Sequence, residues 1–125
     1  MIKNLLIIGS GGFLGSVARY LVSQLNLSVK FHSIPVGTLI VNVTGCLIIG
    51  FLTGVANKSM VLNAGWRLFL MVGVCGGFTT FSTFAGENLA LLHNGQVAAV
   101  LLYTGLSIFL GFLAVFLGYI LTNLL

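Results

Sequence analysis

One stretch near the middle of the chain combines adjacent glycines, hydroxyl side chains and phenylalanines. It spans Gly73–Phe84 and reads GVCGGFTTFSTF within an otherwise apolar region. Glycine, threonine and serine either lower helix propensity or compete for backbone hydrogen bonds. We therefore expect the helix to break here, because freed carbonyl and N–H groups at a break can hold ions. The alternative is a kinked helix whose Ser and Thr side chains bond back to their own backbone.

Two aromatic residues of this stretch have the spacing of a shared helix face. Phe81 and Phe84 are three positions apart. An aromatic ring has a positive edge, so two such edges can meet an anion without the tight binding of a full cation. The hydroxyls of Thr80 and Ser82 flank Phe81 and belong to the same candidate pore. The alternative is that the rings face lipid or the packed core.

Further polar side chains fall in other apolar segments. Asn42 lies well inside one, and Thr38 precedes it by one helical turn on the same face. An amide is costly in lipid unless it is paired, so it faces another helix or a pathway. Tyr103 and Ser107 form a second polar stripe at a spacing of four. Interhelical hydrogen bonding or simple packing would explain these residues without transport.

Two charged residues are also placed within apolar segments. Arg19 can anchor its helix at the membrane interface, or attract anions to a pore entrance. Glu87 is the only acid in the chain. It suggests proton coupling, but a buried, hydrogen-bonded structural carboxylate is the preferred interpretation. We find no Ser-His-Asp set, no paired carboxylates and no metal-ligand spacing, so we do not expect an enzyme.

The composition requires lipid as the solvent for most of the chain. Of the 125 residues, 58% are hydrophobic and 5% are charged, whereas an ordinary soluble domain has about 25% charged residues. The five Lys and Arg residues are scattered, which argues against nucleic-acid binding. Cys46 and Cys75 lie in apolar segments and are interpreted as small apolar fillers rather than a disulfide or metal site.

The apolar segments predict an all-α membrane protein, a single domain over residues 1–125. A helix needs roughly 20 apolar residues to cross the hydrocarbon. Three GxxxG pairs, beginning at Gly11, Gly50 and Gly73, predict close helix packing and self-association. The expected spans are about Leu5–Leu25, Val36–Val55, Gly65–Leu92, which is interrupted, and Val97–Leu121.

The chain shows no internal repeat, although many transporters build their pathway from two inverted halves. A two-fold partner would therefore have to be a second copy. Lys3, Lys58 and Arg67 fall on one side of the membrane, and Arg19 and Lys30 fall toward the other. This bias is weak under the positive-inside rule. Two alternatives therefore stay open. Either all chains insert in one orientation, or the chain inserts in both orientations and two copies pair antiparallel.

Three segments of the chain resemble the Fluc (CrcB-type) fluoride-channel family. They are Gly15–Tyr20 (GSVARY), Gly37–Asn42 (GTLIVN) and Gly73–Phe84, and the similarity covers essentially the whole chain. The resemblance implies an antiparallel, dual-topology homodimer with two fluoride pores in the bacterial cytoplasmic membrane. It also implies that Phe81, Phe84 and Asn42 line a pore.

The same resemblance assigns further roles. The backbone carbonyls of Gly76 and Thr79, two from each chain, would hold a structural Na+ at the dimer centre. Arg19 would lie near the pore entrance, and Tyr103 and Ser107 would join a polar track. Fluoride is small and strongly hydrated, so its path must replace water without trapping the ion. We expect hydroxyl, amide and ring-edge groups to do this, with no Lys or Arg at mid-depth.

The expected function is passive export of toxic fluoride from the cytoplasm. A small four-helix multidrug exporter, which exchanges protons for cationic drugs, is the second reading. It would have to use Glu87, because the first span holds Arg19 and no acid. A third reading is a structural or assembly subunit without transport.

Overall fold

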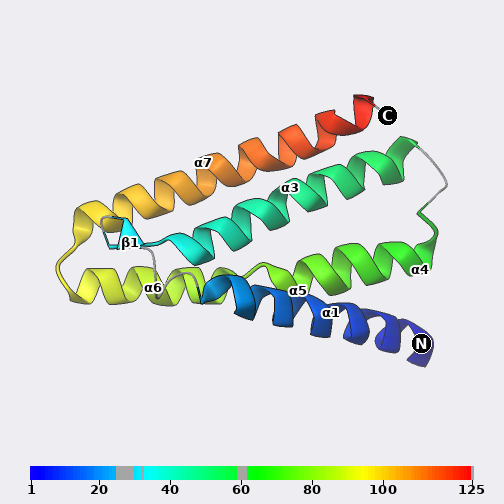
Figure 1. The fold of residues 1–125 in the computed structure, drawn as a ribbon, viewed down its shortest axis with the longest axis horizontal. Coiled ribbons are helices and arrows are strands. Elements are labelled where there is room, and N and C mark those ends of the chain that lie inside the picture. Colours follow the sequence, from blue (N-terminus) through cyan, green and yellow to red (C-terminus); the bar gives the residue numbers. More distant parts are fainter. Residues whose placement is uncertain (25–29, 32, 59–61, 125) are drawn as a thin grey trace.

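A computed structural model describes residues 1–24, 30–31, 33–58 and 62–124. In these ranges the chain is almost entirely helical, and four helical segments are long and apolar enough to cross a membrane. Figure 1 shows the four running lengthwise through the molecule. They are α1 (Ile2–Ser23), α3 (Val36–Lys58), a third span over Ala64–His93, and α7 (Val97–Leu121). The expected all-α transmembrane fold is thereby confirmed.

The third span is assembled from four shorter pieces. A short helix, α4 (Ala64–Arg67), leads into a π-helix, η1 (Leu68–Cys75), which the sequence did not predict. The one-turn helix α5 (Gly76–Phe78) follows, and α6 (Phe81–His93) resumes after an extended step. The side chain of Asn63 caps α4 by accepting the N–H of Trp66 at 3.0 Å. Gly95, in the left-handed region at φ 70, then turns the chain into α7.

The first span packs against the third through glycines. A Cβ at Gly11 or Gly15 would overlap backbone atoms of η1 and α5, and one at Gly77 would overlap the backbone of Gly12. The two backbones therefore touch directly, which is how small residues join membrane helices. Because the helix in this region is wound as a π-helix, its register against α1 could not be read from heptad or 3.6-residue spacing.

The second and fourth spans form the other close pair. A Cβ at Gly50 would overlap the backbone of Val115, and one at Gly118 would overlap that of Leu47. Figure 1 shows α3 and α7 side by side along most of their length. The GxxxG pairs are thus used for packing inside one chain, so they give no information on self-association.

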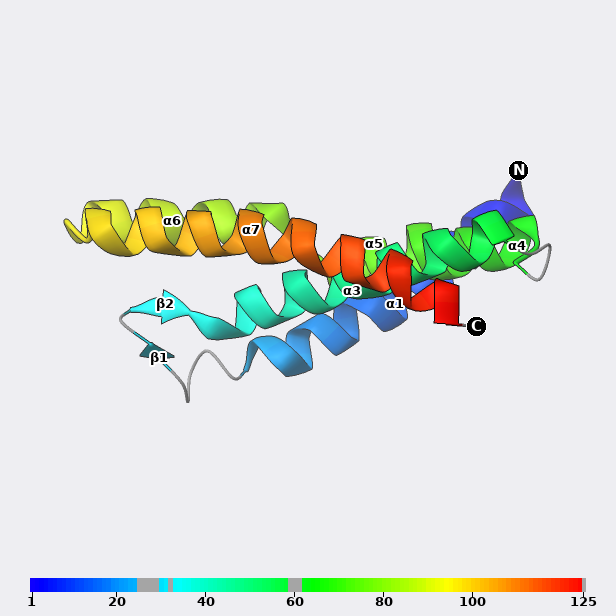
Figure 2. The same ribbon diagram turned by 90° about the horizontal axis from the view of Figure 1, so that it is seen from above.

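Apart from η1, the differences from the expected spans lie at their ends. A hairpin of β1 (Lys30–Phe31) and β2 (Ile34–Pro35) lies between the first and second spans, immediately before α3. Figure 2 places this hairpin at the same end of the molecule as the α6–α7 turn. The expected end of the first span, Leu25, and parts of the first two connections between spans, at residues 26–29, 32 and 59–61, lie outside the described residues. After α7, a single 3₁₀ turn, η2 (Thr122–Leu124), follows.

The opposite end of the molecule collects positive charge at helix C-termini. The Lys58 ammonium donates to the carbonyl of Thr122 at 2.8 Å, and the Arg67 guanidinium donates to the carbonyl of Ala56 at 2.8 Å. Cations at the C-terminal ends of helices satisfy carbonyls that lack a helical donor. These contacts place Lys58 and Arg67 on one side of the membrane, as the sequence predicted.

Candidate functional site

The predicted break in the third span is present, two residues beyond the adjacent glycines. Gly76 is helical at φ −63, ψ −36, and α5 continues to Phe78. Thr79 (φ −77, ψ 156) and Thr80 (φ −151, ψ 116) are extended, and α6 begins at Phe81. The hydroxyl residues form the break, whereas Gly77 is needed for contact with α1. The alternative of an uninterrupted, kinked helix is thus wrong.

Side chains replace the backbone hydrogen bonds that the break removes. The Asn42 amide donates to the Thr80 carbonyl at 3.0 Å, and its oxygen accepts the Thr80 N–H at 2.8 Å. The Thr80 hydroxyl accepts the N–H of Thr83 at 3.2 Å and so caps α6. In lipid such pairing is required, because no water is present to satisfy exposed peptide groups. The interhelical hydrogen bond considered for Asn42 is therefore confirmed.

This arrangement releases two carbonyls from the helical ladder. In a continuous helix the N–H of Thr80 would donate to the carbonyl of Gly76, and the N–H of Thr83 to that of Thr79. Both N–H groups donate to side chains instead. The carbonyls of Gly76 and Thr79, which the resemblance assigned to Na+, have thus lost their helical donors.

A cavity of about 450 Å³ lies beside the break, between α3, the third span and α7. It brings together most of the predicted site, from three separate spans. None of the described residues that line it is charged. The predicted residues on its wall are Asn42, Gly76, Thr79, Thr80, Phe81, Phe84 and Ser107.

The two phenylalanines have different surroundings within this cavity. Their ring centroids are 5.8 Å apart, and the ring planes are inclined by 43°. Phe84 also makes an edge contact with the ring of Tyr103, at 5.0 Å between centroids. Phe81 is 79% exposed, so in the isolated chain its ring covers little and is left open to lipid or to another chain.

Behind Phe84, a carboxylate is held by two hydroxyls. The hydroxyl of Thr38 donates to one oxygen of Glu87 at 2.7 Å, and that of Tyr103 donates to the other at 2.7 Å. Thr38 and Tyr103 are both buried, and neither lines the cavity beside the break. The preferred interpretation of Glu87 as a hydrogen-bonded structural carboxylate is confirmed, although the residue is only partly buried. The hydroxyls of Thr38 and Tyr103 are directed to Glu87.

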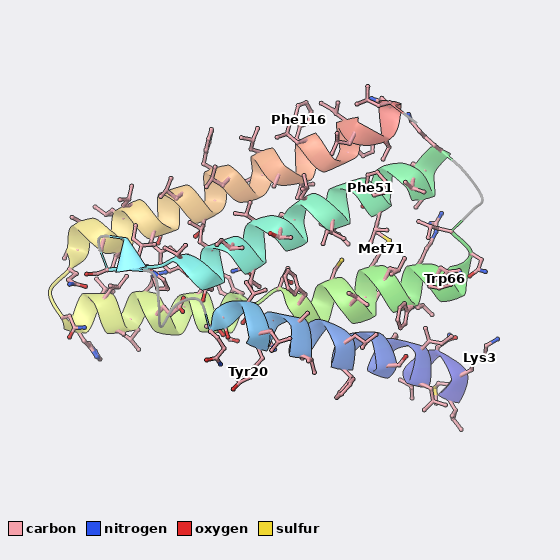
Figure 3. All side chains as sticks on the ribbon, viewed as in Figure 1. Lys3, Tyr20, Phe51, Trp66, Met71 and Phe116 are labelled. Atoms are coloured by element: carbon pink, nitrogen blue, oxygen red, sulfur yellow. The ribbon has the colours of Figure 1, made fainter. Side chains whose placement is uncertain are left out.

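A second, polar cavity of about 300 Å³ lies on the α1 side of the break. Arg19 lines it together with Thr38 and Thr80, and Thr80 borders both cavities. Figure 3 labels Tyr20, which lines the same cavity, on α1. Arg19 therefore shares a cavity with Thr80, one of the two extended residues of the break.

Several residues on this second cavity were not singled out from the sequence, and two of them, Ser16 and Thr83, carry hydroxyls near the predicted residues. Ser16 precedes Arg19 by three residues, so helical spacing alone could have indicated their common face. Thr83 closes the hydroxyl run and bonds to Thr80, with 3.0 Å between their hydroxyl oxygens. Ser82 lines neither cavity, and its hydroxyl lies 3.3 Å from that of Thr80.

Comparison with known proteins gives a consistent result over nearly the whole chain. Residues 6–119 match the family described as CrcB-like protein, Camphor Resistance (CrcB). The chain is 42% identical to a fluoride-specific ion channel FluC of Azobacteroides pseudotrichonymphae, over 98% of each chain. It is 46% identical to the FluC of Rhizobium meliloti, over 93% of each. It is 39% identical to that of Flavobacterium psychrophilum, over 97% of this chain and 98% of the relative.

Proposed function

Because the chain belongs to the CrcB-like family of multi-pass bacterial membrane proteins, we propose that it conducts fluoride passively out of the cytoplasm, across the cytoplasmic membrane. Relatives that bear the name fluoride-specific ion channel match it over almost their full length. The single structural observation that carries the proposal is the uncharged cavity at the break of the third span.

The groups on the cavity wall suit a small, strongly hydrated anion. The Asn42 amide nitrogen has two N–H groups, and one of them donates to Thr80, so the second can face an ion. The hydroxyl of Ser107 and the edge of the Phe84 ring add further partial positive charge. Such groups replace hydration water without the deep binding of a full cation, and conduction requires this balance.

Arg19 carries a full positive charge, and it lies outside the uncharged cavity. It lines the second cavity, which Thr80 separates from the first. A cationic side chain in a polar recess raises the local concentration of anions. We therefore assign Arg19 to drawing fluoride toward the break, and the uncharged cavity to passing it on.

The proposal includes an antiparallel homodimer, with two pores and a Na+ ion at its centre. The Gly76 and Thr79 carbonyls suit such an ion, because they have lost their helical donors and Na+ binds unwound backbone carbonyls. No atom outside the local helix would lie within 4 Å of a Cβ at Gly76. That open face leaves room for a second chain. The bound ion would supply a buried positive field.

Fluoride efflux from liposomes that contain the purified protein tests the conducting function. We expect fluoride to leave down its gradient without any proton gradient, and chloride to leave far more slowly. Equal fluoride and chloride efflux, or efflux no faster than from empty liposomes, would refute the proposal. Dependence on a proton gradient that is abolished by Glu87→Gln would instead favour the exporter.

The ion at the dimer centre is tested separately by thermal unfolding. The purified protein should unfold at a higher temperature in Na+ than in the large cation N-methylglucamine at equal ionic strength, because an ion bound only by the folded state stabilises it. An unfolding temperature that does not depend on Na+ concentration would count against this ion without affecting the proposed fluoride flux.

A further inference from the structure

Three sulfur-bearing side chains line the cavity beside the break. Met71 and Cys75 come from η1, where a separation of four residues places them on one face. Cys46 comes from α3, and its sulfur lies on the α7 side of the cavity, 3.6 Å from where a Cβ at Gly111 would be. Figure 3 shows Met71 on the side of the third span that faces α3. Two thiols and a thioether, from two packed helices, therefore line one cavity.

Neighbouring contacts show how closely these walls approach. The residue before Cys46 is Gly45, where a Cβ would overlap the methyl group of Thr79. The hydroxyl of Thr79 in turn donates to the carbonyl of Cys75 at 3.0 Å. The backbones that carry the two cysteines are thus linked through one threonine side chain. Both cysteines are free thiols.

Sulfur donors of this kind select soft metal ions. Thiolate and thioether ligands prefer Cu(I) and similar ions over Mg²⁺ or Ca²⁺, which need oxygen ligands. Across the described residues, no group of three His, Cys, Asp or Glu side chains is placed to hold a metal. The set at the cavity is completed only by the thioether of Met71. It therefore suits a soft monovalent cation and offers little to a hard divalent one.

We propose that Cys46, Cys75 and Met71 form a binding site for a soft monovalent metal ion, Ag(I) or Cu(I). Each thiol that coordinates releases its proton to water as the metal–sulfur bond forms, and no oxidation state changes. The sequence alone led us to treat both cysteines as apolar fillers. Their shared cavity with Met71 changes that interpretation. A metal bound here occupies the space beside Phe84 and Ser107 and so blocks fluoride, a consequence that depends on the proposed function.

Titration of the purified full chain with silver nitrate, in a chloride-free buffer, tests the binding. Silver–thiolate absorption in the ultraviolet and the heat of binding should both saturate for the natural chain. Cys46→Ala/Cys75→Ala should weaken the affinity at least about tenfold, which corresponds to about 1.4 kcal/mol. Ile49→Val is the matched control, because Ile49 lines the same cavity without sulfur. Failure to bind silver, or an affinity that the double replacement leaves unchanged, would overturn the site.

Flux measurements test the block independently of binding. Silver should stop fluoride efflux from liposomes that contain the natural chain, and excess dithiothreitol should restore it. Silver and fluoride form no insoluble salt, so both can be present together. In Cys46→Ala/Cys75→Ala, efflux with and without silver should agree; persistent inhibition would overturn the proposed block. Absent fluoride efflux without silver would refute the proposed function, whereas the titration would still test the metal site.

Discussion

Replacing Asn42 with Ala should destabilise the backbone at the break in the third span. The Asn42 amide satisfies both the carbonyl and the N–H of Thr80, at 3.0 and 2.8 Å. Leaving a buried polar group unpaired costs about 1–3 kcal/mol, so two such groups cost about 2–6 kcal/mol. The lower value alone corresponds to about thirtyfold in an equilibrium constant. We expect fluoride efflux to fall, because Asn42 also lines the cavity.

The assay is hydrogen exchange at the Thr80 amide, in protein reconstituted into lipid. Exchange in Asn42→Ala should be at least about thirtyfold faster than in the natural chain. Asn88→Ala is the matched control, because Asn88 also makes two side-chain hydrogen bonds, to Phe84 and Thr104. Its backbone partner lies within α6, where the helical ladder already pairs it. Unchanged Thr80 exchange in Asn42→Ala, or an equal effect of Asn88→Ala, would show that the Asn42 hydrogen bonds do not stabilise the break.

Three other replacements test separate parts of the structure. Gly15→Ala should lower the stability by about 1–3 kcal/mol, because the added methyl group overlaps the backbone of the third span. Gly9→Ala is the control, because Gly9 has open space around it. Equal unfolding temperatures of the two variants in detergent would contradict this packing. Tyr103→Phe should lower the stability by about 1–3 kcal/mol, because the buried Tyr103 hydroxyl no longer donates to the partly buried carboxylate of Glu87. A loss no larger than that of exposed Tyr119→Phe in the same assay would argue against this role. Arg19→Gln should slow fluoride efflux by about tenfold or less at low ionic strength, and by less in high salt, because salt screens the lost charge. A reduction in efflux rate that does not depend on salt would exclude electrostatic attraction by Arg19.

The spans could be predicted because their signal is local. The fourth span begins at Val97 and ends at Leu121 as expected, since polar residues bound an uninterrupted apolar run. The second begins at Val36 as expected but continues to Lys58, which donates to the carbonyl of Thr122 on a distant segment. Helix ends that depend on such tertiary contacts are not encoded in hydropathy.

The break could be placed within a stretch but not at a residue. Gly, Thr and Ser all disfavour a continuous helix, so the prediction covered the whole stretch Gly73–Phe84 without choosing between its glycines and its hydroxyl residues. In the structure the backbone of Gly77 is pressed against Gly12, and the chain opens only at Thr79 and Thr80. Gly77 is a glycine because α1 approaches it closely. The sequence does not say which helix lies beside Gly77, so it could not reveal this reason.

The hydrogen-bond partners within the site could not be predicted from the sequence for the same reason. Thr38, Glu87 and Tyr103 could each be identified as polar residues in apolar segments. Their mutual hydrogen bonds join positions that are 49 and 16 residues apart in the chain. That Arg19 shares a cavity with Thr80 likewise depends on how the end of α1 packs against the other spans. Hydropathy gives the depth of a residue within its own span, but not which neighbours it meets.

The most direct test of the account is whether blocking the cavity beside the break stops fluoride. In a Cys46→Ala/Cys75→Ala background, Ile49→Cys places a thiol on the cavity wall, and Leu101→Cys places one on the lipid-exposed surface of α7. Fluoride efflux is measured before and after a small thiol reagent is added, with the extent of labelling determined by mass spectrometry. The account predicts that labelling at position 49 abolishes efflux and labelling at 101 leaves it unchanged. Undiminished efflux from chains fully labelled at position 49 would contradict it.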